Sequence, residues 1–267
     1  MARFLSGKLL PRIAYPVLRG PLRGARFVLG SAAGPGRGAT IYLNLSESQK
    51  VSVLSNSLKK GQIFFDIGAN VGLYTILGSR LVGPEGKVVA FEPLVRNIFY
   101  LYKHVSLNRA SNVLILPVSC SNTLELADFA LGTNPATGHL EGLTAAWGKK
   151  GHDDVTLVST VTLDAAARGL NTYPDVIKID VEGAELQVLE GAREVLSTAK
   201  PDIFLSVHSH DLQTGCLQYL QDLDYTLQSS IEEGYGEAML CLYHSRRKVH
   251  ATPSAEWRQT TRNHRTD

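Results

Sequence analysis

Short runs of apolar residues alternate with longer amphipathic stretches between residues 62 and 207. Five runs are continuously apolar, as expected of strands that are covered on both faces. These runs are 62–67, 87–92, 112–118, 175–180 and 202–208. Helical patterns separate them at 73–81, 94–107, 184–198 and 212–222. This order predicts a parallel, doubly wound α/β sheet, and two further runs, 225–230 and 238–244, predict an antiparallel hairpin at its edge.

Three regions lie outside this alternation. Residues 1–60 contain a glycine-rich stretch and a polar helical pattern, which predict a cap on the same domain. The main domain is expected over 61–245, with a small β excursion at 122–163 near the ends of the strands. Residues 246–267 form a polar, basic tail.

The first strand ends in an aspartate and a glycine-rich turn, DIGANVG, at 66–72. Gly68 and Gly72 allow positive φ angles and a close approach of the backbone to a ligand, and Asn70 tolerates a left-handed turn. A dinucleotide fingerprint would read G-x-G-x-x-G and hold a pyrophosphate. Asp66 would repel a pyrophosphate, so the pattern favours a ligand with a positive charge, such as an amino group. A plain glycine turn capped by the aspartate is the alternative.

Glu92 ends the next strand, 20 residues after Gly72. A carboxylate at this distance typically accepts hydrogen bonds from both hydroxyls of a ribose. The turn and the acid together predict a ligand that contains a nucleoside. Because a pyrophosphate signature is missing, this ligand is expected to be S-adenosylmethionine rather than NAD.

Polar residues also follow two later strands, which end at Asp180 and His208. In a doubly wound order the strand before Asp180 lies beside the strand before Asp66, so Asp180 is predicted to face the cofactor and the acceptor. A helix N-cap is the alternative role for Asp180. The near-neutral pKa of histidine suits His208 to accept a proton from a hydroxyl, although a lone histidine is more often structural.

Composition and charge add few constraints. The chain of 267 residues is 44% hydrophobic and 19% charged, which is typical of a globular domain, and its net charge of +2 gives no indication of a nucleic-acid partner. Residues 1–46 hold seven basic residues and no acidic one, which predicts a solvated segment or a weak contact with a membrane surface. No apolar run reaches the ~20 residues that span a bilayer. Three cysteines without metal spacing fit the reduced thiols of a cytoplasmic protein.

Several motifs together resemble one known family. FDIGANVGLYT, VVAFEP, SLN, TLD, VIKIDVEGAE and VLEGA occur in the order and at the spacing of the FkbM family of S-adenosylmethionine-dependent methyltransferases. The resemblance covers about residues 60–210. It implies the Rossmann-like, seven-stranded sheet of class I methyltransferases, mostly parallel with an antiparallel edge hairpin. It also implies O-methylation of a hydroxyl on a sugar, a polysaccharide or a polyketide-type natural product.

The family pattern assigns parts of the cofactor to particular residues. Asp66 would face the methionine part, Glu92 would hold the ribose, and Ser119 and Cys120 would lie near the adenine. The full set of expected cofactor contacts is Asp66, Gly68, Ala69, Asn70, Gly72, Glu92, Ser119, Cys120 and Asp180.

The same pattern places Glu182 on the side of the acceptor, together with Asp180 and His208. Tyr74 is a further candidate on this side, because its ring could pack on a sugar or macrolide; a place in the core is the alternative for it. One departure concerns the histidine: many relatives carry Glu-x-His after the fifth strand, whereas this chain has Ser206-Val207-His208. A carboxylate that would accompany His208 is therefore missing at position 206.

His208 is expected to be the general base, with Asp180 aiding the orientation of the hydroxyl. The rival means of activation is a Mg²⁺ or Mn²⁺ ion held by Asp180, Glu182 and His208. The residues are also compatible with two other functions. One is a non-catalytic S-adenosylmethionine-binding partner of a biosynthetic complex, and the other is an NAD-dependent oxidoreductase.

Overall fold

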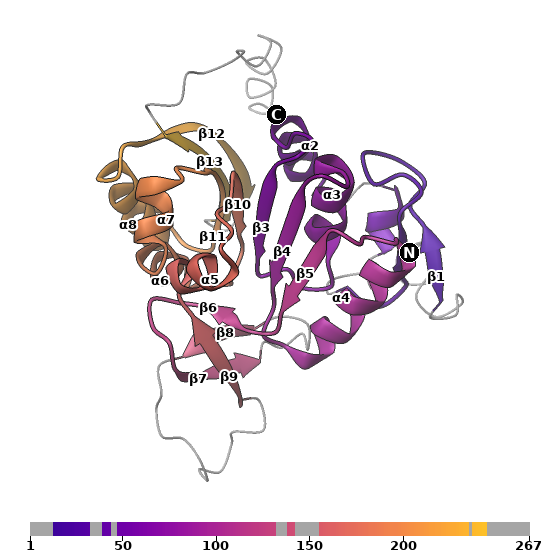
Figure 1. The fold of residues 1–267 in the computed structure, drawn as a ribbon, viewed down its shortest axis with the longest axis horizontal. Helices are drawn as coiled ribbons and strands as arrows, with labels where there is room; N and C mark the ends of the chain where they lie inside the picture. The colour runs from indigo at the N-terminus through magenta and orange to yellow at the C-terminus, as the bar shows by residue number, and fades with distance from the viewer. Residues whose placement is uncertain are drawn as a thin grey trace, which may run out of the picture.

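The structure is a computed structural model that describes residues 13–32, 39–43, 47–131, 138–141, 155–234 and 237–244 (Figure 1). The basic tail predicted over 246–267 and the basic residues before Ile13 lie outside the described residues.

Seven strands form the central sheet in the order β12-β13-β11-β10-β3-β4-β5. Strands β11, β10, β3, β4 and β5 run parallel to one another, and β13 runs antiparallel to both β11 and β12. The doubly wound sheet with an antiparallel edge is thereby confirmed. The strands are β3 (Ile63–Ile67), β4 (Lys87–Phe91), β5 (Val113–Leu116), β10 (Val176–Ile179), β11 (Asp202–Val207), β12 (Tyr225–Gly234) and β13 (Glu237–His244).

Helices cover both faces of this sheet (Figure 1). Neighbouring strand residues face opposite layers: Phe64 packs in a cluster with Leu54 and Ile76, whereas Phe65 packs with Leu189 and Leu220. This double burial explains why the strands read as continuous apolar runs. The helices that follow β3 are α3 (Leu73–Val82), α4 (Val95–Leu107), α5 (Leu163–Leu170), α6 (Glu185–Glu190), α7 (Arg193–Thr198) and α8 (His210–Gln221).

Two helices differ from the sequence prediction. The single helix expected over 184–198 is broken into α6 and α7 at Gly191. A Cβ at Gly191 would lie 2.1 Å from the carbonyl oxygen of Ser121, so the break accommodates a close backbone contact from a distant segment. Helix α5 was not predicted; Thr162 caps it by accepting a hydrogen bond from the Ala165 N–H at 3.1 Å.

The predicted β excursion is a separate sheet of four strands in the order β6-β9-β7-β8. Phe129 and Val158 of this sheet pack against Leu94, which directly precedes α4. The small sheet therefore lies beside the carboxyl end of β4. Its strands are β6 (Ser119–Cys120), β7 (Leu126–Leu131), β8 (Gly138–Glu141) and β9 (Val155–Val161).

The N-terminal part packs on the α3–α4 side of the sheet. Val28 donates its N–H to Nε2 of the buried His104 at 3.0 Å, and the Nδ1–H of His104 donates to the carbonyl of Val71 at 2.6 Å. Burial lowers the pKa of His104 to about 4, so the ring is neutral. Its two hydrogen bonds connect Val28 in the N-terminal part to Val71 in the glycine turn. The elements here are β1 (Ala14–Pro16), β2 (Arg26–Val28), η1 (Ala39–Leu43) and α2 (Ser48–Ser57).

Two general features complete the fold. Within the described ranges, no helix is both long and apolar enough to cross a membrane. All three cysteines are buried and unpaired.

Candidate active site

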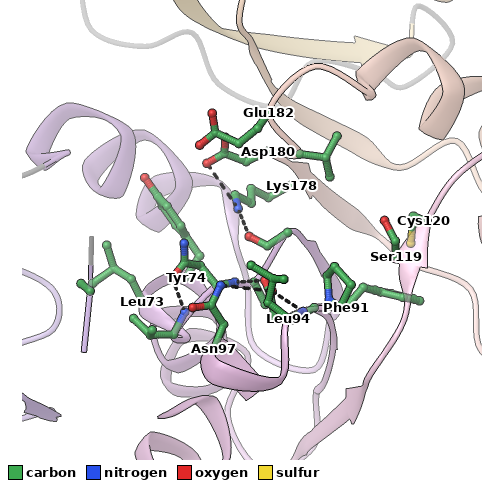
Figure 2. A pocket seen from close by; sticks show the side chains of 18 of the residues that line it. Leu73, Tyr74, Phe91, Leu94, Asn97, Ser119, Cys120, Lys178, Asp180 and Glu182 are labelled. Carbon is green, nitrogen blue, oxygen red and sulfur yellow. Dashed lines mark hydrogen bonds and ion pairs between the residues drawn. The ribbon is translucent and has the colours of Figure 1, made fainter. Parts of the chain in front are cut away.

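A cavity of about 250 Å³ opens at the carboxyl ends of β3, β4 and β10 (Figure 2). Its walls come from the loops after these strands, from β6 and β7, and from the N-terminal part of the chain. Figure 2 shows Lys178, Asp180 and Glu182 together on one wall, with Ser119 and Cys120 on another. Ligands bind at this edge in open α/β sheets, so the cavity is the candidate active site.

The glycine turn adopts the backbone predicted for it. Gly68, Asn70 and Gly72 have φ angles of +73°, +51° and +95°. A Cβ at Gly68 would lie 1.9 Å from the carbonyl oxygen of Asp180, so only glycine fits there. Gly68, Ala69 and Asn70 line the cavity, but Gly72 does not, because it packs against Leu101 of α4.

Glu92 ties this turn to the start of α4. Its Oε2 accepts the Asn70 N–H at 2.7 Å, and its Oε1 accepts the Leu94 N–H at 3.0 Å and the Asn97 Nδ2 at 3.2 Å. Burial raises the pKa of Glu92, and these hydrogen bonds oppose that rise. A carboxylate oxygen has two lone pairs, so Oε2 can accept a further hydrogen bond from a hydroxyl in the cavity.

Asp66 lies beneath the cavity instead of facing it, contrary to the expected contact with the methionine part of the cofactor. The side chain is fully buried and is not among the cavity-lining residues. Its Oδ2 accepts the hydroxyl of Thr75 at 2.6 Å, and its Oδ1 lies 3.4 Å from Nζ of Lys178. A buried carboxylate needs such partners, so the charge of Asp66 is neutralised within the fold.

Lys178 is a buried charged residue of the cavity wall that sequence reasoning missed. Its ammonium lies 3.4 Å from Asp66, 3.5 Å from Asp180 and 5.1 Å from the centre of the Tyr74 ring, and it donates to the carbonyl of Gly68 at 3.0 Å. Burial alone would lower its pKa, but the two carboxylates raise it, so the side chain is charged. The sequence did hold a signal for this residue, since Lys178 is a charged residue inside the apolar run VIKID. In the structure Lys178 pairs in register with Asp66 of the neighbouring strand β3.

His208 is surrounded by carboxylates. Its Nδ1 lies 2.8 Å from Oε1 of Glu185, and its Nε2 lies 3.5 Å from Asp180 Oδ1 and 3.6 Å from Glu182 Oε2. Burial alone would lower its pKa, but the hydrogen bond to Glu185 and the neighbouring negative charges raise it to about 9. His208 does not line the cavity itself, but it contacts Asp180 and Glu182, which do.

Asp180 lies between Lys178 and His208 and contacts both side chains. Burial alone would raise its pKa, but Lys178, Lys50 and His208 lower it, so Asp180 is ionised. Glu182 has a left-handed backbone with a φ of +57°, which is strained for a residue other than glycine. This turn holds the Glu182 carboxylate beside Nε2 of His208.

The remaining predicted residues also lie at the cavity. Ser119, Cys120 and Tyr74 line it, and burial raises the pKa of the Cys120 thiol, so this cysteine is a small neutral side chain. The Tyr74 hydroxyl donates to the carboxylate of Glu47 at 2.5 Å, which brings the N-terminal part of the chain into the wall. Among the described residues, no group of three or more His, Cys, Asp or Glu side chains is arranged to hold a metal ion.

The strand order and the cavity are those of a class I methyltransferase fold. The family model of the methyltransferase FkbM domain matches residues 66–227. The chain therefore belongs to the FkbM methyltransferase family, whose members use S-adenosylmethionine as the methyl donor.

The individual proteins that this chain resembles share 30% or less of their sequence with it. Methyltransferase sdnD of Sordaria araneosa is 30% identical over an alignment of 165 positions. The match covers 52% of this chain and 63% of that protein, so this chain spans less than two thirds of its relative. The FkbM methyltransferase structure from Methylobacillus flagellatus has a TM-score of 0.49 at 16% identity, over 76% of this chain and 53% of that one. Aeropyrum pernix fibrillarin with natively bound S-adenosyl-L-methionine has a TM-score of 0.48 at 14% identity, over 73% and 74% of the two chains.

Proposed function

We propose that this chain is an S-adenosylmethionine-dependent O-methyltransferase that acts on a hydroxyl of a sugar, a polysaccharide or a polyketide-type natural product. The observation that carries the proposal is the histidine held among three carboxylates, two of which line the cavity. Such an arrangement can orient a hydroxyl and accept its proton.

The walls of the cavity fit the cofactor of the family. Glu92 offers a carboxylate oxygen to the ribose, and the backbone of Gly68 to Asn70 permits close approach. Ser119 and Cys120 form a compact wall suited to the adenine. Lys178, rather than Asp66, is the buried charged side chain that reaches the cavity beside Gly68.

S-adenosylmethionine, held beside Gly68 and Glu92, would supply an electrophilic methyl group with a neutral thioether as its leaving group. The chain's own task is then to position the hydroxyl and to remove its proton. Asp180, which is ionised, accepts a hydrogen bond from the hydroxyl and orients its oxygen. The His208 side chain is 19% exposed beside Asp180, and its Nε2 takes the proton in the fraction of molecules in which the ring is neutral.

The charges of the acceptor side favour a hydroxyl-rich, uncharged acceptor. Asp180, Glu182 and Glu47 all line the cavity, and carboxylates accept hydrogen bonds from hydroxyl groups. An acceptor with a phosphate or carboxylate at this position would meet like charge, which is unfavourable. This pattern supports a polyol or another neutral hydroxylated molecule.

Transfer of a labelled methyl group tests the proposal. The purified chain is incubated with methyl-labelled S-adenosylmethionine and with matched pairs of sugars and hydroxylated polyketides, each pair differing by one free or blocked hydroxyl. We expect a labelled methyl ether on the free-hydroxyl member only. Label on nitrogen or carbon would contradict O-methylation, and binding of the cofactor without transfer to any acceptor would favour a non-catalytic partner.

A further inference from the structure

A second carboxylate system lies behind His208, on the side away from Asp180. Oε1 of Glu185 is 2.8 Å from Nδ1 of His208 and also accepts the N–H of Gly183 at 2.9 Å. Glu185 is fully buried at the first residue of α6, and within the described part of the chain no group donates to its Oε2. An ionised carboxylate in such a place is expensive to bury, so its main compensation is the contact with the imidazole.

Strand β11, which ends directly before His208, offers the ring no carboxylate from position 206, two residues earlier. Position 206 of β11 is a serine, and this side chain is buried. Glu185 reaches the ring from α6, which packs against β11 and α8. The acid therefore comes from a different element.

We propose that Glu185 is the positioning residue of His208. By accepting the Nδ1–H, Glu185 fixes the tautomer that leaves Nε2 as the proton acceptor, and it stabilises the imidazolium that forms when the proton arrives. Glu185 itself touches neither substrate nor cofactor. The role of Glu185 in catalysis rests on the proposed function. The contact between Glu185 and His208, however, has consequences that can be measured without substrate.

Titration of His208 by NMR in the histidine-labelled full chain is the first test. His208 faces Glu185 from α6 and Asp180 and Glu182 from the turn after β10. The His208 signal is assigned from its loss in His208→Gln. We expect Glu185→Gln, which keeps the size and an acceptor oxygen but removes the charge, to lower the pKa of His208 by at least one unit and to reduce the share of the Nδ1–H tautomer. Glu190→Gln is the matched control, because Glu190 lies exposed on the same helix and contacts Asn122 instead.

Kinetics give the second readout once an acceptor is known. Glu185→Gln is expected to lower kcat about 10- to 100-fold, the loss seen when the carboxylate partner of a metal-bound histidine is removed, with KM for S-adenosylmethionine nearly unchanged. The inflection of the rate against pH should move down with the pKa measured by NMR. Glu185→Asp keeps the charge at a shorter reach and should restore part of both effects.

These experiments test the role of Glu185 independently of whether the chain transfers methyl groups. An unchanged His208 titration in Glu185→Gln overturns the proposal, even if the wild-type chain transfers methyl groups. If Glu185→Gln does not fold, Glu185→Asp decides: a wild-type titration, or a failure to fold as well, assigns Glu185 a structural role and overturns the proposal. If the wild-type chain methylates nothing, a lowered pKa in Glu185→Gln still supports the pair, and only the proposed function fails.

Discussion

Replacing Lys178 by methionine is expected to lower the free energy of unfolding by about 3–5 kcal/mol. The ammonium is almost completely buried and lies 3.4 Å from Asp66 and 3.5 Å from Asp180. Methionine has a similar length, so the variant removes the charge with little loss of volume. It leaves the fully buried Asp66 without its cation, which is the main cost. Chemical denaturation of the wild type and the variant measures the difference.

Two further variants isolate the ion pair. Asp66→Asn in the Lys178→Met background should recover part of the loss, because the amide oxygen can still accept the Thr75 hydroxyl and no buried charge remains. Lys87→Met is the matched control on the neighbouring strand β4, where the lysine is exposed, and should change stability by less than about 0.5 kcal/mol. A loss below about 1 kcal/mol for Lys178→Met would contradict the assigned role.

His208→Gln is expected to lower kcat/KM about 10²- to 10⁴-fold, the usual contribution of a general base. Binding of S-adenosylmethionine should stay within about twofold, because His208 does not line the cavity. The adjacent carboxylates raise the pKa of His208 to about 9, and a base acts only when deprotonated. The wild-type kcat/KM should therefore rise about tenfold per pH unit from neutral pH and level off above pH 9, whereas the variant should lack this rise.

His210→Gln provides the comparison for this experiment, since His210 is the exposed first residue of α8 and should leave the profile unchanged. A His208→Gln variant with more than a third of the wild-type kcat/KM, or with the same pH profile, would remove His208 from the mechanism.

The sequence predicted the sheet and most of the positions at its edge. Continuous apolar runs mark strands that are covered on both faces, and parallel strands bring their carboxyl ends to one edge. The sequence alone therefore indicated that the glycine turn, Glu92 and Asp180 lie at the same edge of the sheet. The expected adjacency of β10 and β3 is confirmed by the register of Lys178 with Asp66.

Features that depend on three-dimensional contacts were missed. Asp66 looked like a ligand contact because the sequence does not show that Lys178 from the next strand covers its carboxylate. The break between α6 and α7 follows from the approach of the Ser121 carbonyl to Gly191, which no local pattern reports. In the same way, VEGAE contains two glutamates, and only the backbone geometry decides that Glu185 is buried against His208 while Glu182 is half-exposed.

Calorimetric titration of the purified chain with S-adenosylmethionine, and separately with NAD, tests the central claim most directly. The account predicts binding of one S-adenosylmethionine per chain with a Kd of about 1–100 µM, within the usual range for enzyme substrates, and no detectable heat from NAD. Binding of NAD alone, or no binding of S-adenosylmethionine at millimolar concentration, would contradict the assignment of the cavity beside Gly68 and Glu92.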